Sequence, residues 1–343
     1  MTAPLHVFSS YGRRAASPRI RAYHWVERLG IGTVQHDYLG TFTAGARDLL
    51  AHPLRAAVAE ARLRAATGLE RVFIQRETSP LSTGNIEERI LRTADVGVYD
   101  LDDGFPWDTS GTVRRLFPKA RKAERAAQAA DRVVVANGVL AEWASNLNDD
   151  VRIIPSCVEP NDYVPKRDYA VGDHPIVGWI GSPWTLPYVR TIEPALLQLH
   201  AETGARLEVV GSQSASLGHL ERMVDRIEWS EQVAHTRPAG WDVAIAPLRH
   251  GAFERARSSY KLLQYAAAGV PSIASRWGAT GEIVTSLGAH GADSQDEWLD
   301  QFHAVLGLSP DERATLGAVQ RAAAERSYSY NAWSDEWRSV IGE

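Results

Sequence analysis

A basic, serine-containing segment stands at the start of the most apolar helix that the sequence predicts. The run Val243–Pro247 has the composition of a buried strand, and an apolar helix is expected over Ser259–Ala268. Between them lie Arg257, Ser258 and Ser259, and Lys261 falls in the first turn of the helix. A helix N-terminus offers backbone N–H groups and a positive dipole end, and serine is a preferred N-cap. A lysine there is unfavourable for the helix alone by about 0.3–1 kcal/mol. The pattern favours an anion, most simply a phosphate, and a serine-capped helix with a solvated lysine is the alternative.

Three carboxylates follow another expected strand. Asp100 ends the run Val96–Asp100, and Asp102 and Asp103 follow it in YDLDDGFPW. Carboxylates this close are expected to raise one another's pKa. They could bind the hydroxyl groups of a substrate by hydrogen bonds or take a proton from one of them. Asp102 and Asp103 are therefore candidate catalytic residues. A cation site and a simple turn are the two alternatives.

A third polar segment is basic. The stretch Ser9–Tyr23 follows the first expected strand and carries four arginines, which are Arg13, Arg14, Arg19 and Arg21. A loop at the carboxyl end of a strand that opens a helix is well placed to approach a diphosphate. Solvated surface arginines are the alternative for at least two of the four.

Short β-branched runs alternate with longer amphipathic segments, the pattern of βαβ units and parallel sheets. In the first half, strands are expected at 5–9, 33–36, 71–75, 96–100, 132–136 and 152–154, with helices at 18–29, 46–67, 86–93, 111–130 and 138–147. In the second half, strands are expected at 176–180, 207–210, 243–247 and 272–274, with helices at 188–203, 259–268, 297–306, 310–326 and 333–341.

A proline-rich connector separates the two halves. Residues 155–175 contain Pro155, Pro160, Pro165 and Pro175, and proline disfavours regular elements. At 343 residues the chain is long enough for two cores. We expect an α/β protein with a domain over 1–165, a second over 166–325, and a C-terminal helix over 326–343 that returns to the first. In open parallel sheets ligands bind beyond the carboxyl ends of the strands, so a cleft between the two domains is expected.

The overall composition excludes several classes of protein. A net charge of −5 with interspersed signs argues against a nucleic-acid-binding protein. The single cysteine, Cys157, forms no internal disulfide, and the N-terminal MTAPLHVFSS lacks a signal-peptide pattern, so a cytoplasmic protein without stable membrane insertion is expected. The histidines show no metal-ligand spacing, and the first strand–helix turn lacks the dinucleotide-binding glycines, which makes a nicotinamide dehydrogenase the least favoured enzyme.

The segment FERARSSYKLLQYAAAGVP, residues 253–271, resembles the donor segment F-E-R-x-K-x-x-Y-K-L-L-Q-Y-x-A-x-G-x-P of one branch of glycosyltransferase family 4. The resemblance extends to VGWIGSPWTLPYV (177–189), LEVVG (207–211), RVFIQRE (71–77), VYDLDDGFPW (98–107) and DRVVVAN (131–137). Nearly the whole chain is covered in one order. The resemblance implies the GT-B fold, in which two Rossmann-like domains face each other across a cleft and the C-terminal helix crosses back to the first domain.

The resemblance also implies residue roles. Arg257 and Lys261 would neutralise the donor diphosphate in place of a metal, so no metal site or cofactor is expected. The other donor-binding candidates are Gly181, Ser182, Gly211, Ser258, Ser259, Tyr260, Gln264, Glu282, Arg19 and Arg21. The family's E-x₇-E pair is not intact, because Ala256 and Gln264 occupy its two positions. This departure leaves the sugar contacts, and with them the donor's identity, unassigned.

The expected function is a retaining transfer of a sugar from a nucleoside diphosphate sugar to an acceptor hydroxyl of a small molecule or glycan. The family implies retention without a covalent enzyme intermediate. Two alternatives stay open: a catalytically silent sugar-nucleotide-binding protein, and a different two-Rossmann enzyme such as an epimerase or a pseudo-glycosyltransferase that forms a non-glycosidic bond. The nucleotide, the sugar and the acceptor are not specified by the sequence.

Overall fold

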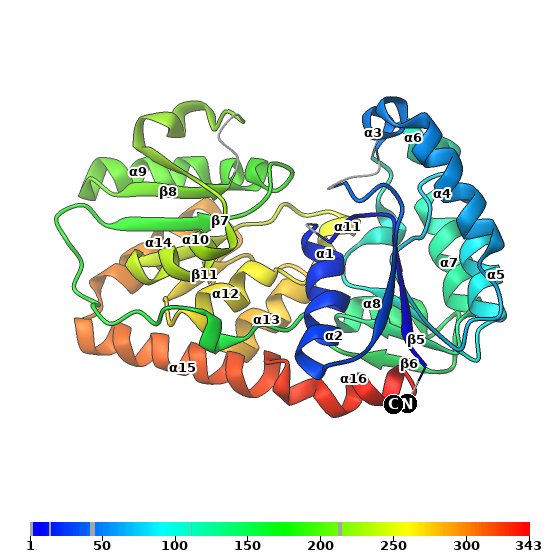
Figure 1. The fold of residues 1–343 in the computed structure, drawn as a ribbon. Helices are drawn as coiled ribbons and strands as arrows, with labels where there is room; N and C mark the ends of the chain where they lie inside the picture. The colour runs from blue at the N-terminus through cyan, green and yellow to red at the C-terminus, as the bar shows by residue number, and fades with distance from the viewer. Residues whose placement is uncertain (1–2, 14, 42–44, 111, 212–214) are drawn as a thin grey trace. The chain divides into compact units, whose positions relative to one another are not determined.

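The computed structural model describes residues 3–13, 15–41, 45–110, 112–211 and 215–343 (Figure 1). The chain forms two compact units. Unit 1 comprises Met1–Cys157, Ala256–Ser258 and Trp333–Glu343, and unit 2 comprises Val158–Arg255 and Ser259–Ala332. The last residues of the chain therefore pack with its beginning, as expected for a returning C-terminal helix.

Unit 1 is built on a six-stranded parallel sheet in the order β2-β1-β3-β4-β5-β6. Its strands are β1 (Leu5–Ser9), β2 (Thr33–Asp37), β3 (Arg71–Gln75), β4 (Val96–Leu101), β5 (Arg132–Val135) and β6 (Val151–Ile153). β1 has β2 on one side and β3 on the other, so the strand order reverses at β1. The loops after β1 and β3 consequently diverge, and such a switch point is where open parallel sheets bind ligands.

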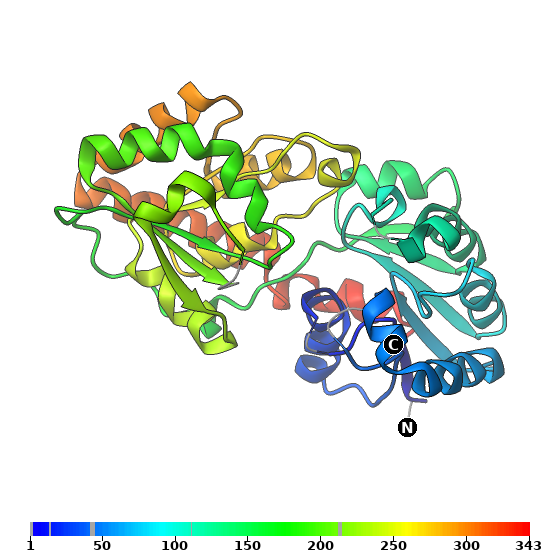
Figure 2. The ribbon, with the colours of Figure 1, turned by 90° about the horizontal axis from the view of Figure 1, so that it is seen from above.

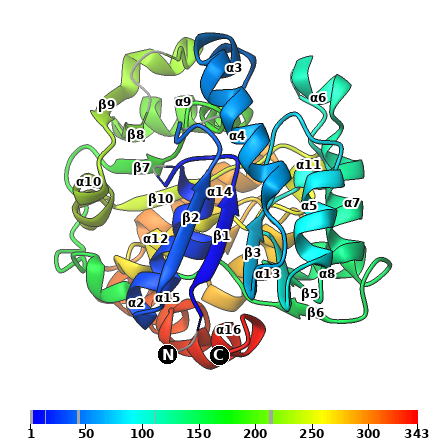
Figure 3. The ribbon, with the colours of Figure 1, turned by 45° about the vertical axis from the view of Figure 1, so that its right-hand side comes forward.

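Helices cover both faces of this sheet. They are α1 (Ala16–Pro18), the π-helix η1 (Arg19–Tyr23), α2 (His24–Leu29), α3 (Ala46–Ala51), α4 (Pro53–Ala65), α5 (Asn85–Arg92), the 3₁₀ turn η2 (Phe105–Trp107), α6 (Thr112–Leu116), α7 (Lys119–Ala129), α8 (Gly138–Ala144) and α16 (Ser334–Val340). Figures 1 and 3 show α2 on one side of β1 and α4 and α5 on the other.

The core of unit 1 follows from the alternation of side chains along the strands. Val72 and Ile74 of β3 pack into the cluster that contains Leu63 of α4. Phe73 points to the opposite face, where its ring lies 5.9 Å from that of Trp337 in α16. Trp337 also stacks on Trp25 of α2 at 5.4 Å. Because Trp25 and Trp337 are both buried, the C-terminal helix completes this face of the sheet.

Unit 2 has a second six-stranded parallel sheet, ordered β12-β11-β10-β7-β8-β9 (Figure 2). Its strands are β7 (Ile176–Ile180), β8 (Arg206–Gly211), β9 (Val224–Glu228), β10 (Val243–Ala246), β11 (Ser272–Ala274) and β12 (His290–Gly291). The chain runs outward through β8 and β9 and then returns to β10 on the other side of β7. The second switch point is therefore at β7.

The helical elements of unit 2 are η3 (Pro160–Asp162), η4 (Leu186–Ile192), α9 (Glu193–Thr203), η5 (Gly218–Met223), α10 (Glu231–Thr236), η6 (Arg237–Gly240), α11 (Ala252–Arg255), α12 (Tyr260–Ala267), α13 (Ala279–Leu287), α14 (Gln295–Gly307) and α15 (Pro310–Tyr328); η7 (Asn331–Trp333) leads into α16. Leu196 of α9 and Trp298 of α14 belong to one buried cluster, and Leu262 of α12 and Ala323 of α15 belong to another. Gly178 of β7 lies against the ring of Trp241, which a Cβ at that position would strike.

The observed fold confirms the expected α/β class and two parallel sheets. Two strands were missed, β9 and β12, because β9 carries three charged residues and β12 has only two residues. Two long expected helices are each divided in two, at His52 and at Phe117–Pro118. The stretch 155–175 is extended apart from η3 and an isolated bridge at Val158, and the change of unit falls at Cys157–Val158. Arg14 and Gly111 lie outside the described residues.

Candidate functional site

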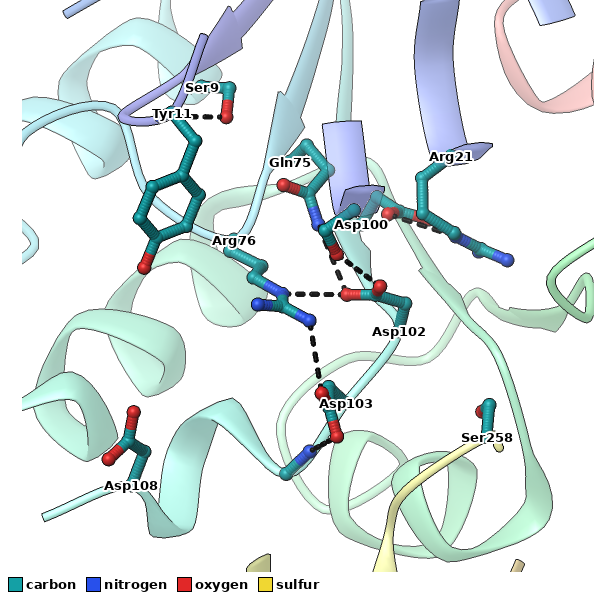
Figure 4. A network of polar contacts seen from close by, with 12 residues as sticks. Ser9, Tyr11, Arg21, Gln75, Arg76, Asp100, Asp102, Asp103, Asp108 and Ser258 are labelled. Atoms are coloured by element: carbon teal, nitrogen blue, oxygen red, sulfur yellow. Dashed lines mark hydrogen bonds and ion pairs between the residues drawn. The ribbon is translucent and has the colours of Figure 1, made fainter. Parts of the chain in front are cut away.

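Polar side chains gather at the switch point of unit 1, where β1, β3 and β4 end (Figure 4). The parallel register places Ser9 beside Gln75 and Gln75 beside Asp100. Backbone bonds fix the loops that follow. The Ser10 amide donates to the Glu77 carbonyl at 2.7 Å, and the Arg76 amide donates to the Asp100 carbonyl at 2.9 Å. The buried Oε1 of Gln75 accepts no hydrogen bond from the described residues.

Arg76 links the two candidate carboxylates. Its Nε donates to Asp102 Oδ1 at 2.7 Å and its Nη2 to Asp103 Oδ2 at 3.3 Å. Its φ is 61°, a left-handed conformation that costs a non-glycine residue about 1–3 kcal/mol. The Tyr99 hydroxyl donates to its carbonyl at 2.9 Å and helps to hold that conformation. The strained backbone aims one guanidinium at both carboxylates.

Asp102 is also bound from two other elements. Gln75 Nε2 donates to Asp102 Oδ1 at 3.1 Å, and the hydroxyl of Ser17, in α1, donates to Asp102 Oδ2. Asp102 and Asp103 each keep 13% of their side-chain surface exposed. Both carboxylates are therefore held in place but remain partly accessible to solvent.

The pKa values of Asp100 and Asp102 are shifted in opposite directions. Burial opposes ionisation of Asp102, but the charge and hydrogen bond of Arg76 outweigh it and hold its pKa below the ordinary value. The expectation that crowding raises every pKa is thus wrong for Asp102, because a buried arginine stands between it and Asp103. Burial raises the pKa of Asp100 to about 6, in spite of the attraction of Arg21.

Arg21 is enclosed by unit 1. Its Nη2 lies 2.6 Å from Asp100 Oδ1, and its Nη1 donates to the Ile154 carbonyl at 2.7 Å. Only 2% of the Arg21 side chain is exposed, and none of Asp100. Arg19, two residues before Arg21 in the same π-helix, is half-buried. This position gives Arg21 the task of holding β4 and the end of β6 together, and we propose that task for it in place of a contact with the donor.

The segment Ala256–Ser258 packs within unit 1, although the residues on either side of it belong to unit 2. Asn137 Nδ2 donates to the Ala256 carbonyl at 2.9 Å and to the Ser258 hydroxyl at 2.8 Å. Arg257 Nη2 lies 3.9 Å from Asp103 Oδ2. Ala256 is buried among the apolar residues of the unit 1 core, which is a physical reason for a small apolar residue at this position.

In unit 2, two glycine loops meet over a buried tryptophan. Gly181 follows β7 and Gly211 ends β8, beside the second switch point. A Cβ on Gly211 would strike the Gly181 carbonyl oxygen, and a Cβ on Gly181 would strike the indole of Trp179 and the Thr185 hydroxyl. The two backbones therefore approach as closely as glycine permits. Ser182 is exposed in the first loop, and its carbonyl accepts from the Thr185 amide at 3.0 Å.

Lys261 reaches the same tryptophan from α12. Its ammonium lies 5.1 Å from the centroid of the Trp179 ring, within the range of a cation–π interaction. The serine hydroxyls before α12 are used elsewhere: Ser259 bonds the Thr280 hydroxyl at 2.6 Å, and Ser258 accepts from Asn137. The expected side-chain cap is therefore wrong, because Ser259 occupies the N-cap position without a capping hydrogen bond.

The remaining donor candidates of unit 2 lie in α12 and α13. Gln264 is nearly buried, and its Nε2 donates to the Tyr163 hydroxyl at 3.2 Å. Tyr260 is half-buried in the first turn of α12, and Glu282 is exposed in the first turn of α13. Glu254 is buried and accepts from the Tyr188 hydroxyl at 2.7 Å and from Arg249 Nε at 2.5 Å.

Two kinds of feature are absent from the described residues. No group of three histidine, cysteine or carboxylate side chains there is arranged to hold a metal ion. No helix in the described part of the chain has the length and apolarity to cross a membrane.

The chain matches no known protein-family model, and no curated protein matches its sequence. Solved structures do match its fold. Sucrose-phosphate synthase from Thermosynechococcus elongatus superposes with a TM-score of 0.74 at 14% identity, covering 99% of this chain and 98% of that one. The fold is GT-B. WaaG, a glycosyltransferase involved in lipopolysaccharide biosynthesis, gives 0.67 at 14% identity over 99% and 100% of the two chains. HepE from Anabaena, solved with UDP and glucose, gives 0.63 at 15% identity over 99% and 100%. At these identities the GT-B likeness establishes the fold alone.

Sequence reasoning missed two features of these clusters. Arg76 directly follows the expected strand 71–75, but nothing in the sequence indicates its left-handed backbone. Trp179 joins the core of unit 2, and its contact with Lys261 depends on how α12 packs. Gly181, two residues after Trp179, is the one sequence signal for an indole pressed against the backbone that follows it.

Replacing Arg76 by glycine should raise the pKa of Asp102. Glycine accepts the left-handed backbone but removes the positive charge that favours the carboxylate. If Asp102 must be ionised, the acid limb of the kcat/KM profile will move to higher pH, because protonation then begins at a higher pH. Arg76→Lys should restore the profile in part. An unchanged acid limb in Arg76→Gly would contradict the prediction that Arg76 keeps an essential Asp102 ionised.

Proposed function

We propose that this chain is a glycosyltransferase that moves a sugar from a nucleoside diphosphate sugar to an acceptor hydroxyl. The observation that carries the proposal is the cluster at the carboxyl edge of the unit 2 sheet. There the ammonium of Lys261, the start of α12 and two closely approaching glycine loops share one buried tryptophan. A helix N-terminus and a lysine together suit a diphosphate. Glycine in the two loops lets backbone rather than side chains border this region, and the Gly181 amide itself donates to the Val210 carbonyl at 3.1 Å.

The comparisons support the same ligand class. HepE was solved with UDP and glucose, and another matching structure, from E. coli, has UDP-2-fluoro glucose bound. The resemblance of residues 253–271 to family 4 agrees with these matches, and on it we base the finer proposal of a retaining family 4 enzyme. The other proposed donor contacts are Arg19, Gly181, Ser182, Gly211, Ser258, Ser259, Tyr260, Gln264 and Glu282.

For the chemical step we assign charge stabilisation to Lys261 and Arg257. Negative charge grows on the leaving phosphate as the glycosidic bond breaks, and fixed cations stabilise that transition state more than the ground state. These two residues make a bound metal ion unnecessary for the proposed reaction. Retention would follow if the leaving phosphate itself assists deprotonation of the acceptor.

We assign acceptor binding to Asp102 and Asp103 in unit 1. Arg76 keeps Asp102 ionised, so it can accept a hydrogen bond from a hydroxyl at neutral pH. Its bonds to Ser17, Gln75 and Arg76 fix the carboxylate, and such fixed orientation is what productive positioning of a hydroxyl requires.

A second candidate function follows from the E-x₇-E glutamate pair of family 4, which is not intact in this chain. Alanine occupies the first position of the pair, at Ala256, and the carboxylate of Glu254 is bound by Tyr188 and Arg249. This arrangement would suit a protein that binds a sugar nucleotide without transferring the sugar.

The proposal is tested with UDP-, GDP-, dTDP- and ADP-sugars and a panel of glycan and small-molecule acceptors in the presence of EDTA. One nucleotide class should release nucleoside diphosphate and form a glycoside whose anomeric configuration, assigned by proton NMR, matches that of the donor. Activity that disappears with EDTA and returns with a divalent ion would contradict the metal-independent mechanism, and an inverted anomer would contradict retention. Nucleotide binding with neither transfer nor hydrolysis would favour the silent binding protein.

A further inference from the structure

Helix α4 presents an apolar row to solvent as well as one to the core. Ala56, Ala59 and Leu63 are buried against the unit 1 sheet. Positions 54, 57, 58, 61 and 65 follow the i, i+3, i+4, i+7, i+11 spacing of a single helix face, and they are Leu54, Ala57, Val58, Ala61 and Ala65. All five are exposed. An exposed helix face is normally polar, so this outer row requires a physical reason.

The exposure of its large members is high. Leu54 is 81% exposed and Val58 is 57% exposed, and Leu50 of the preceding helix α3 is also 81% exposed. Each lone exposed leucine would be unremarkable, but three large apolar side chains lie within nine consecutive residues, 50–58, beside three exposed alanines.

Arginines border the apolar row. Helices α3 and α4, residues 46–65, contain four arginines, at 47, 55, 62 and 64, and two acidic residues, Asp48 and Glu60, which leaves a local charge of +2 in a chain of net charge −5. Both carboxylates accept hydrogen bonds from other groups of unit 1. Asp48 accepts from the Gly45 amide at 3.1 Å, and Glu60 accepts from the Tyr38 hydroxyl at 3.0 Å. Glu60 also lies 3.8 Å from the Nε of Arg64, and Arg47, Arg55 and Arg62 supply the net positive charge at the rim of the row.

We propose that the outer face of α4, with Leu50, rests on an anionic lipid surface. Apolar side chains bordered by arginines are the pattern of a helix that lies in the membrane interface, with its apolar face among the acyl chains and its cations at lipid phosphates. A protein partner fits less well, because a stable interface takes about 20–30 residues a side and this row is one helix face wide. The contact is peripheral, and the association is weak and salt-sensitive because few side chains insert.

The test uses an environment-sensitive NBD label. Cys157 is the only cysteine and is buried, so Val58→Cys provides a single accessible thiol on α4. With vesicles of phosphatidylglycerol and phosphatidylcholine in equal parts, the label should brighten and shift to the blue, and it should not respond to pure phosphatidylcholine. The matched control is the label at Val319→Cys, an exposed position on α15 that should stay unchanged.

Unlabelled variants measure the two contributions by vesicle sedimentation. Leu54→Ser/Val58→Ser should lower partitioning at least tenfold. Arg47→Ser/Arg62→Ser should lower it by about 25-fold, at about fivefold per arginine, whereas Arg167→Ser/Arg222→Ser, exposed arginines of unit 2, should change it less than threefold. Circular dichroism should show that each variant is folded.

Three results would overturn the proposal. They are failure of the wild type to bind the anionic vesicles, equal losses in the α4 and unit 2 arginine pairs, and a Val58 label that stays exposed while the protein sediments with vesicles. A dimer in sedimentation velocity that Leu54→Ser/Val58→Ser dissociates, without vesicle binding, would instead assign the row to self-association.

Discussion

Lys261→Ala is expected to lower kcat for sugar transfer by about 10²–10³, the loss typical of removing one preorganised charge-stabilising group from a reacting centre. The ammonium lies over the Trp179 ring beside the two glycine loops, where it can meet a phosphate oxygen. Because its interaction strengthens as charge develops on the leaving group, kcat should fall more than KM rises. Steady-state kinetics with the donor identified by the nucleotide screen measure both.

The matched control is Arg222→Ala, which also removes one cation from unit 2 but at an exposed position in η5. It should leave kcat within twofold. Lys261→Arg should retain part of the activity, since it keeps the charge. Circular dichroism should show Lys261→Ala to be folded. A kcat within threefold of the wild type would remove Lys261 from the catalytic machinery.

Arg21→Met is expected to destabilise unit 1 by about 3–5 kcal/mol at pH 8, because it leaves the Asp100 carboxylate buried without its partner. The three hydrogen bonds from Arg21 to Asp100 and the one to Ile154 are lost together. Urea unfolding followed by circular dichroism measures the change. Since the chain has two units, the transition of unit 1 must be resolved from that of unit 2.

The destabilisation caused by Arg21→Met should decrease as the pH is lowered. In the wild type the pKa of Asp100 is raised to about 6 from its ordinary value of 3.8, so ionising this group lowers stability as pH rises through that interval. Without Arg21 the pKa rises further, and Asp100 is protonated in the native state at pH 5. The destabilisation should therefore be smaller at pH 5 than at pH 8.

The double variant Arg21→Met/Asp100→Leu provides the control. It removes the unpaired charge along with its partner, and replacing a whole buried ion pair by apolar residues is often neutral or stabilising. We expect it to recover most of the stability lost in Arg21→Met. Equal losses at the two pH values, or a double variant no more stable than the single one, would show that the effect is a packing defect.

The strands that carry the candidate site were predictable because they are short, apolar and β-branched. β1, β3, β7 and β11 begin and end at the expected residues. The positions of Asp102 and Lys261 after a strand and at a helix start were predictable for the same reason. β9 was not, since VDRIE has the composition of an edge strand or a loop.

The chemistry of the individual side chains was less predictable. Arg21 and Asp100 are 79 positions apart, and their pairing depends on how η1 packs against β4. The low pKa of Asp102 depends on the backbone of Arg76, a local strain that only the surrounding contacts maintain. Ser258 and Ser259 have the composition of helix caps, but hydrogen bonds to Asn137 and Thr280 compete successfully for their hydroxyls. Sequence patterns indicate elements, whereas tertiary contacts decide the protonation state and the partners of each group.

Thermal shift of the wild type and of Lys261→Ala against UDP, GDP, dTDP and ADP measures whether Lys261 and the glycine loops of unit 2 bind a nucleoside diphosphate. A ligand at a hundred times its Kd should stabilise the wild type by about 2.7 kcal/mol. One nucleotide should raise the Tm of the wild type, and Lys261→Ala should lose most of that response while keeping its Tm without ligand. No response to any nucleotide, or an equal response in the two proteins, would contradict the account.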